Sequence, residues 1–423
     1  MFMASQSTTT PAKRLLSASK IAKAVDALAV IDERRHTKRQ RFSIVSSDAT
    51  AEDLDSASPV IDRYIAVKGV EVVHALTNFS VSELNTLWSN INPYVSKNWN
   101  VGGGRKCPVT GKDMLFMTLV TLKHAGTWDM LAARFDEKAA TFSNRIAQFI
   151  RDLHPYLIRK YIDEQGFKWT MHQLAVAGHQ FETHKSALYA VDVTFQQTSA
   201  PVVSFGEKKT YFSKMHGLYG NKVEESVAPN GLAINATDCA VGSTSGLEMF
   251  KANLGFHSNQ LEKQPNDYNV IDNEALRDKF PSRWALLADK GYQGIQEYVR
   301  GFTPTKRPPH GQLSMEQVRA NAKLASDRVI VENFFGRLKT LWCIVSDKYT
   351  WKKDEYIMYF QTCVDLTNVH VLFNPLRNVD GEGYNQYKNR LISIGSKIKM
   401  RNLFSKANED YDIGYDEGDD IFY

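Results

Sequence analysis

Three acidic residues, Asp192, Asp289 and Glu332, occur where a carboxylate is unusual. Asp192 stands in the apolar run 188–195 and has no basic neighbour, so a buried strand there would carry an uncompensated charge. Burying a carboxylate is costly unless a positive group pairs with it, and a divalent cation would be such a group. Asp289 directly follows the short apolar run 284–288, and strand ends are where α/β folds place ligands.

Glu332 falls within a long predicted helix. Ser314 and Gln317 match the capping-box pattern that begins a helix, which then continues past Glu332 towards residue 342. The expected buried stripe of this helix consists of apolar residues at helical spacing, namely Ile330, Phe334, Leu338 and Leu341. Glu332 lies off that stripe, so it is expected at the rim, facing the strand ends that carry the two aspartates.

Two basic residues of the same helix, Arg328 and Lys339, are expected beside Glu332, also off the buried stripe. Cations in this position are candidates for binding the phosphate groups of DNA. The three carboxylates would form a small ligand set for two Mg²⁺ or Mn²⁺ ions about 4 Å apart. Such ions stabilise both the attacking and the leaving oxygen of a phosphoryl displacement.

Each acid also has an ordinary structural explanation. A single buried Asp often caps a turn or accepts backbone hydrogen bonds, and Asp238 in a neighbouring predicted strand is an equally acidic candidate. Glu332 taken alone would form an ion pair with Arg328 one helical turn away. The three acids are predicted in a strand, at a strand end and in a helix, in that order along the chain. This order favours the catalytic interpretation.

The elements that would position these acids form an α/β pattern. Apolar runs bounded by turn residues predict strands at 188–195, 211–227, 231–241 and 284–288. The pair Asn230-Gly231 favours a hairpin turn between the second and third of these strands. A helix from about 314 to 342 follows, so the domain carrying the acids is expected to span residues 185–378.

Residues 61–184 are predicted to form an α-helical module. Ser80 and Glu83 match a capping box at the start of its first helix, and apolar spacing predicts further helices at 113–123, 128–135 and 139–153. Their short connections fit a helix-turn-helix, whose last helix enters the major groove. In that case, DNA would contact Lys138, Asn144 and Arg145. A plain helical bundle packed on the next domain is the alternative.

Composition limits the class of protein. A hydrophobic content of 43% over 423 residues is enough for a sizeable core, and a net charge of +5 permits a nucleic-acid partner without requiring one. The four cysteines are scattered without metal-binding spacing, which argues against a structural zinc site. No apolar run approaches the eighteen residues of a membrane span, so no membrane partner is expected.

The two ends of the chain differ in charge. Residues 1–60 are predicted to be a disordered, basic, Ser/Thr-rich arm, and the basic cluster at 34–41 resembles a nuclear localisation or phosphate-binding segment. The nucleus is therefore the expected location, with the mitochondrion as alternative because residues 1–25 contain no acid. Residues 379–423 are predicted to be an extension with an acidic tail.

At residues 188–194, 286–294 and 331–342 the chain resembles the DDE superfamily of transposases, most closely the Harbinger-like endonuclease domain. This resemblance implies an RNase H-like mixed sheet flanked by helices, with Asp192, Asp289 and Glu332 as catalytic metal ligands. It also implies a DNA endonuclease and strand-transfer enzyme that acts at the ends of a mobile element. The segment 242–246 departs from the family, because it lacks a His-Asp pair and is followed only by Glu248.

Other readings remain open from the sequence. The chain could be a domesticated, catalytically silent DNA-binding protein of transposase origin, or an RNase H-type nuclease. A separate DNA-binding helper protein is a further expected partner, because members of the family that the chain resembles often act with one. A homo-oligomer is also compatible with the sequence.

Overall fold

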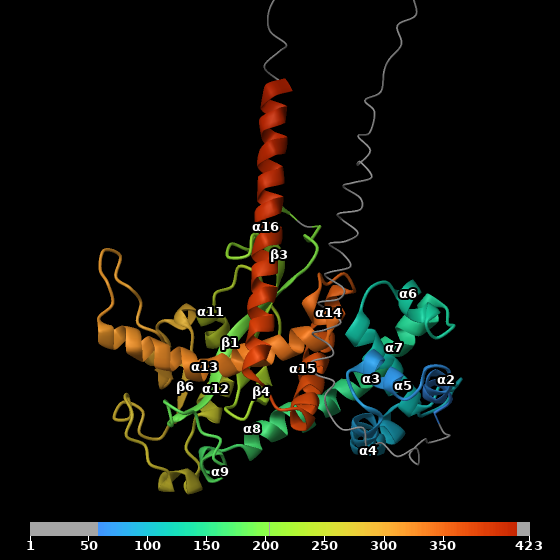
Figure 1. Ribbon diagram of the computed structural model, residues 1–423, viewed down its shortest axis with the longest axis horizontal. Helices are drawn as coiled ribbons and strands as arrows, with labels where there is room; N and C mark the ends of the chain where they lie inside the picture. The colour runs from blue at the N-terminus through green and yellow to red at the C-terminus, as the bar shows by residue number, and fades with distance from the viewer. Residues whose placement is uncertain (1–57, 203, 413–423) are drawn as a thin grey trace, which may run out of the picture. The chain divides into compact units, whose positions relative to one another are not determined.

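The computed structural model describes residues 58–202 and 204–412 (Figure 1). The expected basic arm and the last acidic residues, 413–423, lie outside that range. Within it the chain is a mixed α/β structure in which helices flank a mixed β-sheet, in agreement with the α/β prediction.

The sheet carries the first two aspartates. Its strands are β1 (Ala187–Gln197), β2 (Phe212–Ser213), β3 (Leu218–Val227), β4 (Ala233–Ala236), β5 (Ala240–Val241), β6 (Ala285–Ala288) and β7 (Gly301–Phe302). Their order is β2-β3-β1-β6-β7, and β4 and β5 also pair with β3. Strand β1 runs antiparallel to β3 and parallel to β6, so it has a partner on both sides, which explains its long buried run.

Two of the predicted strands are divided in the structure. The hairpin turn forms as expected, because Gly231 has a φ of 84° and β4 pairs antiparallel with β3. The predicted strand 211–227 breaks into β2 and β3 around Gly217, which also has a positive φ, 66°. The predicted strand 231–241 breaks into β4 and β5, and Asp238 is exposed between them rather than within a strand, so that expectation was wrong.

Helices occupy most of the remaining described chain. They are α2 (Pro59–Lys68), α3 (Glu71–Thr77), α4 (Val81–Asn98), α5 (Gly111–His124), α6 (Trp128–Ala133), α7 (Ala139–Ile158), α8 (Glu164–Lys168), α9 (Met171–Val176), α10 (Phe205–Thr210), α11 (Gly246–Ala252), α12 (Leu254–Gln260), α13 (Met315–Leu341), α14 (Cys343–Ser346), α15 (Tyr356–Phe373) and α16 (Asn378–Asp412). The predicted capping boxes at Ser80 and Ser314 are both present.

Helix α13 is buried more completely than one apolar stripe predicts. Val331, Asn333, Phe335 and Arg337 are buried as well as the expected Phe334, Leu338 and Leu341. Strands β1, β3 and β6 and helices α14, α15 and α16 all contact it. The approach of α16 is so close that a Cβ added at Gly336 would lie 1.7 Å from the Asp380 carbonyl oxygen. Ile330, an expected stripe residue, is only partly buried because it precedes this enclosed segment.

The helices before residue 185 share a core with the rest of the described chain. Phe79 is fully buried, and its ring lies 6.4 Å from that of Trp342 and 5.7 Å from that of His370. Asn78 donates a hydrogen bond of 2.7 Å to the Leu341 carbonyl. The domain boundaries near 61, 185 and 378 remain predictions, since the described residues on both sides of 185 belong to one compact unit.

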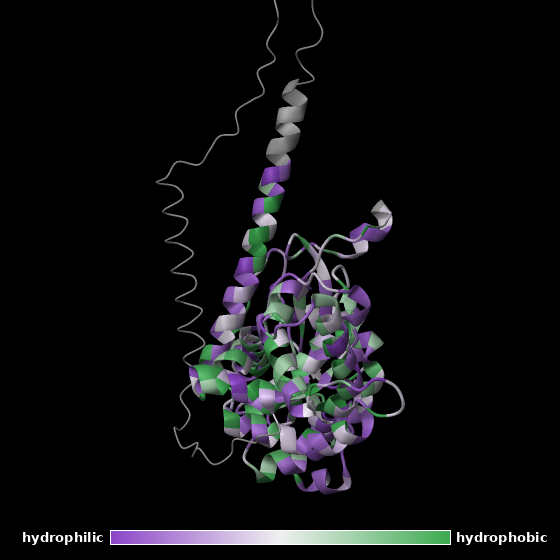
Figure 2. Cartoon of the chain, turned by 90° about the vertical axis from the view of Figure 1, so that its right-hand side faces the viewer, coloured by the Kyte–Doolittle hydropathy of each residue, from purple (hydrophilic) through white to green (hydrophobic). Residues whose placement is uncertain are grey.

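Hydropathy along the ribbon follows this packing. Hydrophobic segments gather in the body, whereas the coloured part of α16 that projects from it alternates between hydrophilic and hydrophobic residues (Figure 2). Among residues 58–202 and 204–412, no helix is long and apolar enough to cross a membrane.

Candidate active site

The strand register brings Asp192 and Asp289 together. Val191 on β1 pairs with Ala288 on the parallel strand β6, and each aspartate is the next residue of its strand or strand end. Neighbouring strands lie about 5 Å apart, so the two aspartates stand at adjacent positions, Asp192 within β1 and Asp289 just after β6. The Asp289 carboxylate also accepts a 2.6 Å hydrogen bond from Gly291 N, which begins the short helix η4 (Lys290–Tyr292).

Arg328 joins Asp192 to Glu332. Its Nη1 lies 3.2 Å from Asp192 Oδ2, and its Nη2 lies 2.7 Å from Glu332 Oε1. The side chains of these three residues are only 14% to 17% exposed. The sequence prediction of an ion pair between Arg328 and Glu332 is therefore confirmed, and the same guanidinium compensates the charge of Asp192, which has no basic neighbour in sequence.

The other two carboxylates act on Asp192. Burial and the negative charges of Asp289 and Glu332 raise the pKa of Asp192 to about 7, although Arg328 opposes the shift. Burial lowers the pKa of Arg328, but Asp192, Glu332 and Asp289 outweigh it and hold that pKa above its ordinary value. Asp192 and Glu332 thus share one internal cation, and the charge of Asp289 acts on Asp192 and on Arg328.

Three further charged residues at this place were missed from the sequence. Lys388 on α16 lies 3.9 Å from Glu332 Oε2. Glu224 and Glu225 on β3 lie opposite Val193 and Asp192 on β1. The two glutamates interrupt a buried strand just as Asp192 does, so the same reasoning could have found them. Nothing local marks Lys388, because its contact depends on how α16 crosses α13.

Glu224 is the centre of a buried hydrogen-bond network. It is fully buried, and its carboxylate accepts a 3.1 Å hydrogen bond from Tyr292 Oη. His257 Nε2 lies 3.1 Å from the same carboxylate, and Tyr189 Oη lies 2.9 Å from His257 Nδ1. Tyr292 belongs to η4, so this network anchors the turn that directly follows Asp289.

Lys339 does not lie beside Glu332, which corrects the sequence prediction. It is 6% exposed, and its ammonium donates a 2.8 Å hydrogen bond to the Val345 carbonyl. Burial lowers its pKa to about 7, although the nearby charge of Glu225 opposes this shift. The residue is enclosed because α16 covers the helix face that was expected to meet solvent, and this position does not suit contact with a DNA phosphate.

The other predicted DNA contacts lie on the helical part of the chain. Lys138 and Asn144 are exposed near the start of α7, whereas Arg145 is only partly exposed and forms an ion pair with Glu137. Glu248, the acid nearest to the segment that departs from the family pattern, caps α11 through a capping box with Ser245. It therefore has a structural role at the start of α11.

The donor set suits a hard divalent cation, because carboxylate oxygens are the ligands that Mg²⁺ prefers. The Arg328 guanidinium between two of the acids shows that this location requires positive charge. As the described side chains stand, however, no three His, Cys, Asp or Glu residues are arranged to hold an ion. A metal at this place would therefore require Arg328 to move away.

Comparison with known proteins points to the same segment. Residues 191–368, which include all three acids, match the family described as DDE superfamily endonuclease. The chain is also similar to a Microchaete diplosiphon protein described as a probable transposase for insertion sequence element IS702, with 39% identity over 72 residues. That similarity covers 17% of this chain and 26% of the relative. No solved structure matches the chain.

Proposed function

We propose that the chain is a metal-dependent DNA endonuclease and strand-transfer enzyme of transposase origin, acting on phosphodiester bonds at the ends of a mobile element. The observation that carries this proposal is that Arg328 pairs with both Asp192 and Glu332, while the strand register places Asp289 next to Asp192. It occurs within the segment that matches the DDE superfamily endonucleases. An enzyme of the Harbinger-like type with an RNase H-like sheet is the specific form that we propose.

In this proposal the three acids hold divalent metal, Mg²⁺ or Mn²⁺. When bound, the metal would activate water or a 3′ hydroxyl and neutralise the leaving 3′ oxygen. The chain's own contribution is to fix the carboxylates on two neighbouring strands and on a helix whose segment around residues 333–339 is buried. Two basic residues lie beside the carboxylates, Arg328 and Lys388. Once a metal displaces Arg328 from the acids, both residues could bind the phosphates of the DNA strand.

The helical part would deliver the DNA. Helices α5, α6 and α7 follow one another with short connections, as in a helix-turn-helix. Lys138 and Asn144, near the start of α7, are exposed. The same proposal includes a location in the nucleus, action with a separate DNA-binding helper protein, and assembly into a homo-oligomer.

A domesticated, catalytically silent DNA-binding protein is the second candidate. The observation that favours it is that Arg328 already neutralises Asp192 and Glu332 without any external ion. In such a protein the carboxylates and the arginine would be kept as a structural cluster, while the helical part binds DNA.

One experiment separates the two candidates. The full chain is incubated with DNA that contains the element ends, in Mg²⁺, Mn²⁺ or EDTA, and with a DNA–RNA hybrid to detect RNase H-type cleavage. We expect metal-dependent cutting of the DNA by the parent and by the control Asp238→Asn, whose side chain is exposed. Asp289→Asn should bind DNA without cutting it. Equal cutting by Asp289→Asn would refute the site, and binding without cutting by the parent would favour the silent protein.

A further inference from the structure

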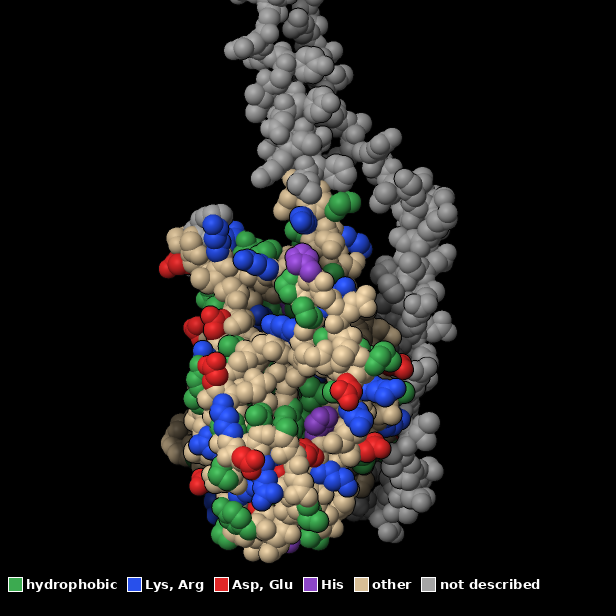
Figure 3. Space-filling view, turned by 90° about the vertical axis from the view of Figure 1, so that its left-hand side faces the viewer, with side chains coloured by type: hydrophobic (Ala, Val, Ile, Leu, Met, Phe, Trp, Pro, Cys, Tyr) green, Lys and Arg blue, Asp and Glu red, His purple; other side chains and the backbone are tan. Residues whose placement is uncertain are grey.

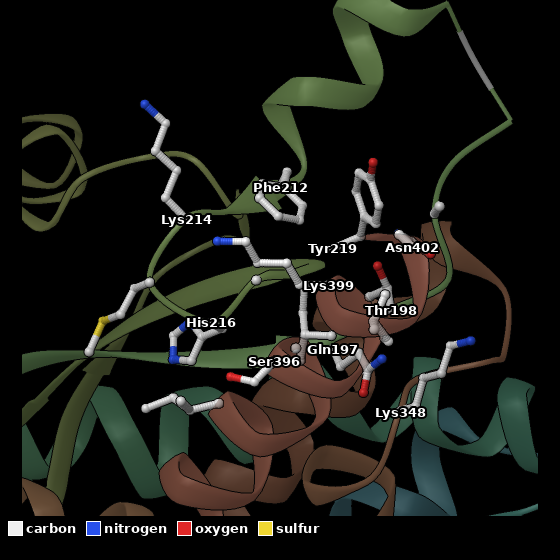
Figure 4. A pocket seen from close by; sticks show the side chains of 17 residues that line it. Gln197, Thr198, Phe212, Lys214, His216, Tyr219, Lys348, Ser396, Lys399 and Asn402 are labelled. Atoms are coloured by element: carbon white, nitrogen blue, oxygen red, sulfur yellow. The ribbon is translucent and has the colours of Figure 1, made fainter. Parts of the chain in front are cut away.

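A second site lies along helix α16, outside the cluster of acids. A cavity of about 570 Å³ opens between the β2–β3 hairpin and α16 (Figure 4). Its lining includes three exposed lysines, Lys214, Lys348 and Lys399, and no acidic residue among those that the structure describes. Its volume is within the range of small-ligand pockets, and its charge suits an anion.

Aromatic side chains lie among these lysines. Phe212 and Tyr219 form an edge-to-face pair with ring centres 5.2 Å apart, and both line the cavity. Lys399 extends from α16 towards Phe212, whereas Lys214 points outward (Figure 4). Basic groups for the backbone and aromatic rings for the bases are the combination that binds single-stranded nucleic acid.

The floor of the cavity is rigidly built. Gly217 and Gly395 meet there, and a Cβ added at Gly395 would lie 2.0 Å from the His216 carbonyl oxygen. The His216 ring stacks on Phe195 with centres 4.3 Å apart. The hairpin and α16 are therefore held at a fixed separation, so the cavity is a property of the fold and does not depend on loose surface side chains.

One face of α16 connects this cavity with the acids. Lys388, which lies beside Glu332, is followed at helical spacing by Ile392, Gly395 and Lys399, all of which line the cavity. At 1.5 Å per residue, Ile392 lies about 6 Å along the helix from Lys388, and Lys399 lies about 16 Å from it. Lys and Arg side chains surround a hollow beside α16 on this face of the molecule (Figure 3).

We propose that the cavity binds single-stranded DNA that flanks the reacting phosphate. A stacked strand advances about 3.4 Å per nucleotide and an unstacked strand advances further, so the distance along α16 places the bound nucleotides within about five positions of the phosphate at the acids. A duplex does not fit this role, because its bases are stacked and paired and cannot reach Phe212 or Tyr219. The inference rests on the proposed function, since it takes the acids as the place where the strand reacts.

The test measures binding and cross-linking in EDTA, so that no cutting is needed. The full chain is titrated with a fluorescent duplex that has a single-stranded extension, and with the blunt duplex. The double variant Lys348→Ala/Lys399→Ala is compared with Lys279→Ala/Lys306→Ala, which removes two exposed lysines elsewhere. We expect the cavity variant to bind the extended probe about tenfold more weakly, with a log-log salt slope reduced by about 1.4, and the control to bind it normally.

Photo-cross-linking then locates the strand. An extension with 5-iodouracil at each position in turn should cross-link to Phe212 or Tyr219 from within about the first five nucleotides and not from more distant ones. Tyr219→Leu should reduce the yield. The blunt duplex should bind both double variants alike. Equal binding of the extended probe by both double variants, or cross-links that map to other segments, would overturn the proposal. Cross-links without metal-dependent cutting would refute only the proposed function. Cutting without cross-links would refute only the proposal that the cavity binds single-stranded DNA.

Discussion

Arg328 Nη1 lies 3.2 Å from Asp192 Oδ2, and this contact defines the resting state of the acidic cluster. The chain itself supplies the positive charge that Asp192 needs, and the same guanidinium also pairs with Glu332. An ion that enters between these carboxylates must compete with the arginine, so binding of metal and displacement of Arg328 are coupled.

Replacing Arg328 with Gln should lower the free energy of unfolding in metal-free buffer by on the order of 2 kcal/mol, because two partly buried carboxylates lose their cation. Added Mg²⁺ or Mn²⁺ should then raise the melting temperature of the variant more than that of the parent. Thermal unfolding with and without metal measures both effects. Arg319→Gln, an exposed change on the same helix, is the control, and an equal metal response in parent and Arg328→Gln would contradict the coupling.

The buried position of Lys339 predicts a pH effect. Because its folded-state pKa is lowered to about 7, the unfolded chain binds a proton that the folded chain lacks between pH 7 and about 10. Lys339 should therefore make the free energy of unfolding of the parent increase as pH rises through this window. Lys339→Met should remove this increase. Urea unfolding at pH 7 and pH 9 measures the difference, and an unchanged pH slope would show that the lysine is exposed.

The network around Glu224 predicts a loss of stability when Tyr292 is changed to Phe. The fully buried carboxylate loses a hydrogen-bond donor, which should cost about 1 to 3 kcal/mol. Since Tyr292 anchors the turn after Asp289, the variant should also respond less to added metal in thermal unfolding. Tyr268→Phe, at a side chain that is 65% exposed, should behave as the parent, and a stable Tyr292→Phe protein would contradict this account.

His216 predicts a pH effect on stability in the acidic range. Burial, with Lys222 and Lys388 nearby, lowers its pKa to about 4, so between pH 6.5 and 4 the unfolded chain binds a proton that the folded chain does not. Its contribution to stability is therefore complete above pH 6.5 and falls as pH decreases. His216→Gln should lose less stability than the parent between pH 7 and 5 in urea unfolding. The exposed variant His310→Gln should keep the parent's slope.

Local patterns were sufficient to predict much of the fold. The capping boxes at Ser80 and Ser314, the hairpin turn at Gly231 and the strand that ends before Asp289 depend on neighbouring residues, and all appear in the structure. A charge inside an apolar strand likewise identified Asp192 without any knowledge of its partner.

Features that depend on distant segments could not be predicted in this way. The contact of Lys388 with Glu332 depends on the crossing of α16 over α13, and the pairing of Asp192 with Glu225 depends on strand register. The error over Lys339 has the same origin. An apolar stripe assumes that one helix face meets water, whereas α16 covers that face in the folded chain.

The contact between Phe79 and Trp342 also limits how this chain could change during evolution or by engineering. A recognition module that precedes an enzyme on a linker can be exchanged for another at little cost. Here, removal of the N-terminal helices would expose Trp342 and leave the Leu341 carbonyl without the Asn78 amide. Under the proposed function, altered DNA specificity would therefore have to arise from substitutions on the exposed side of α7 and not from replacement of the whole module.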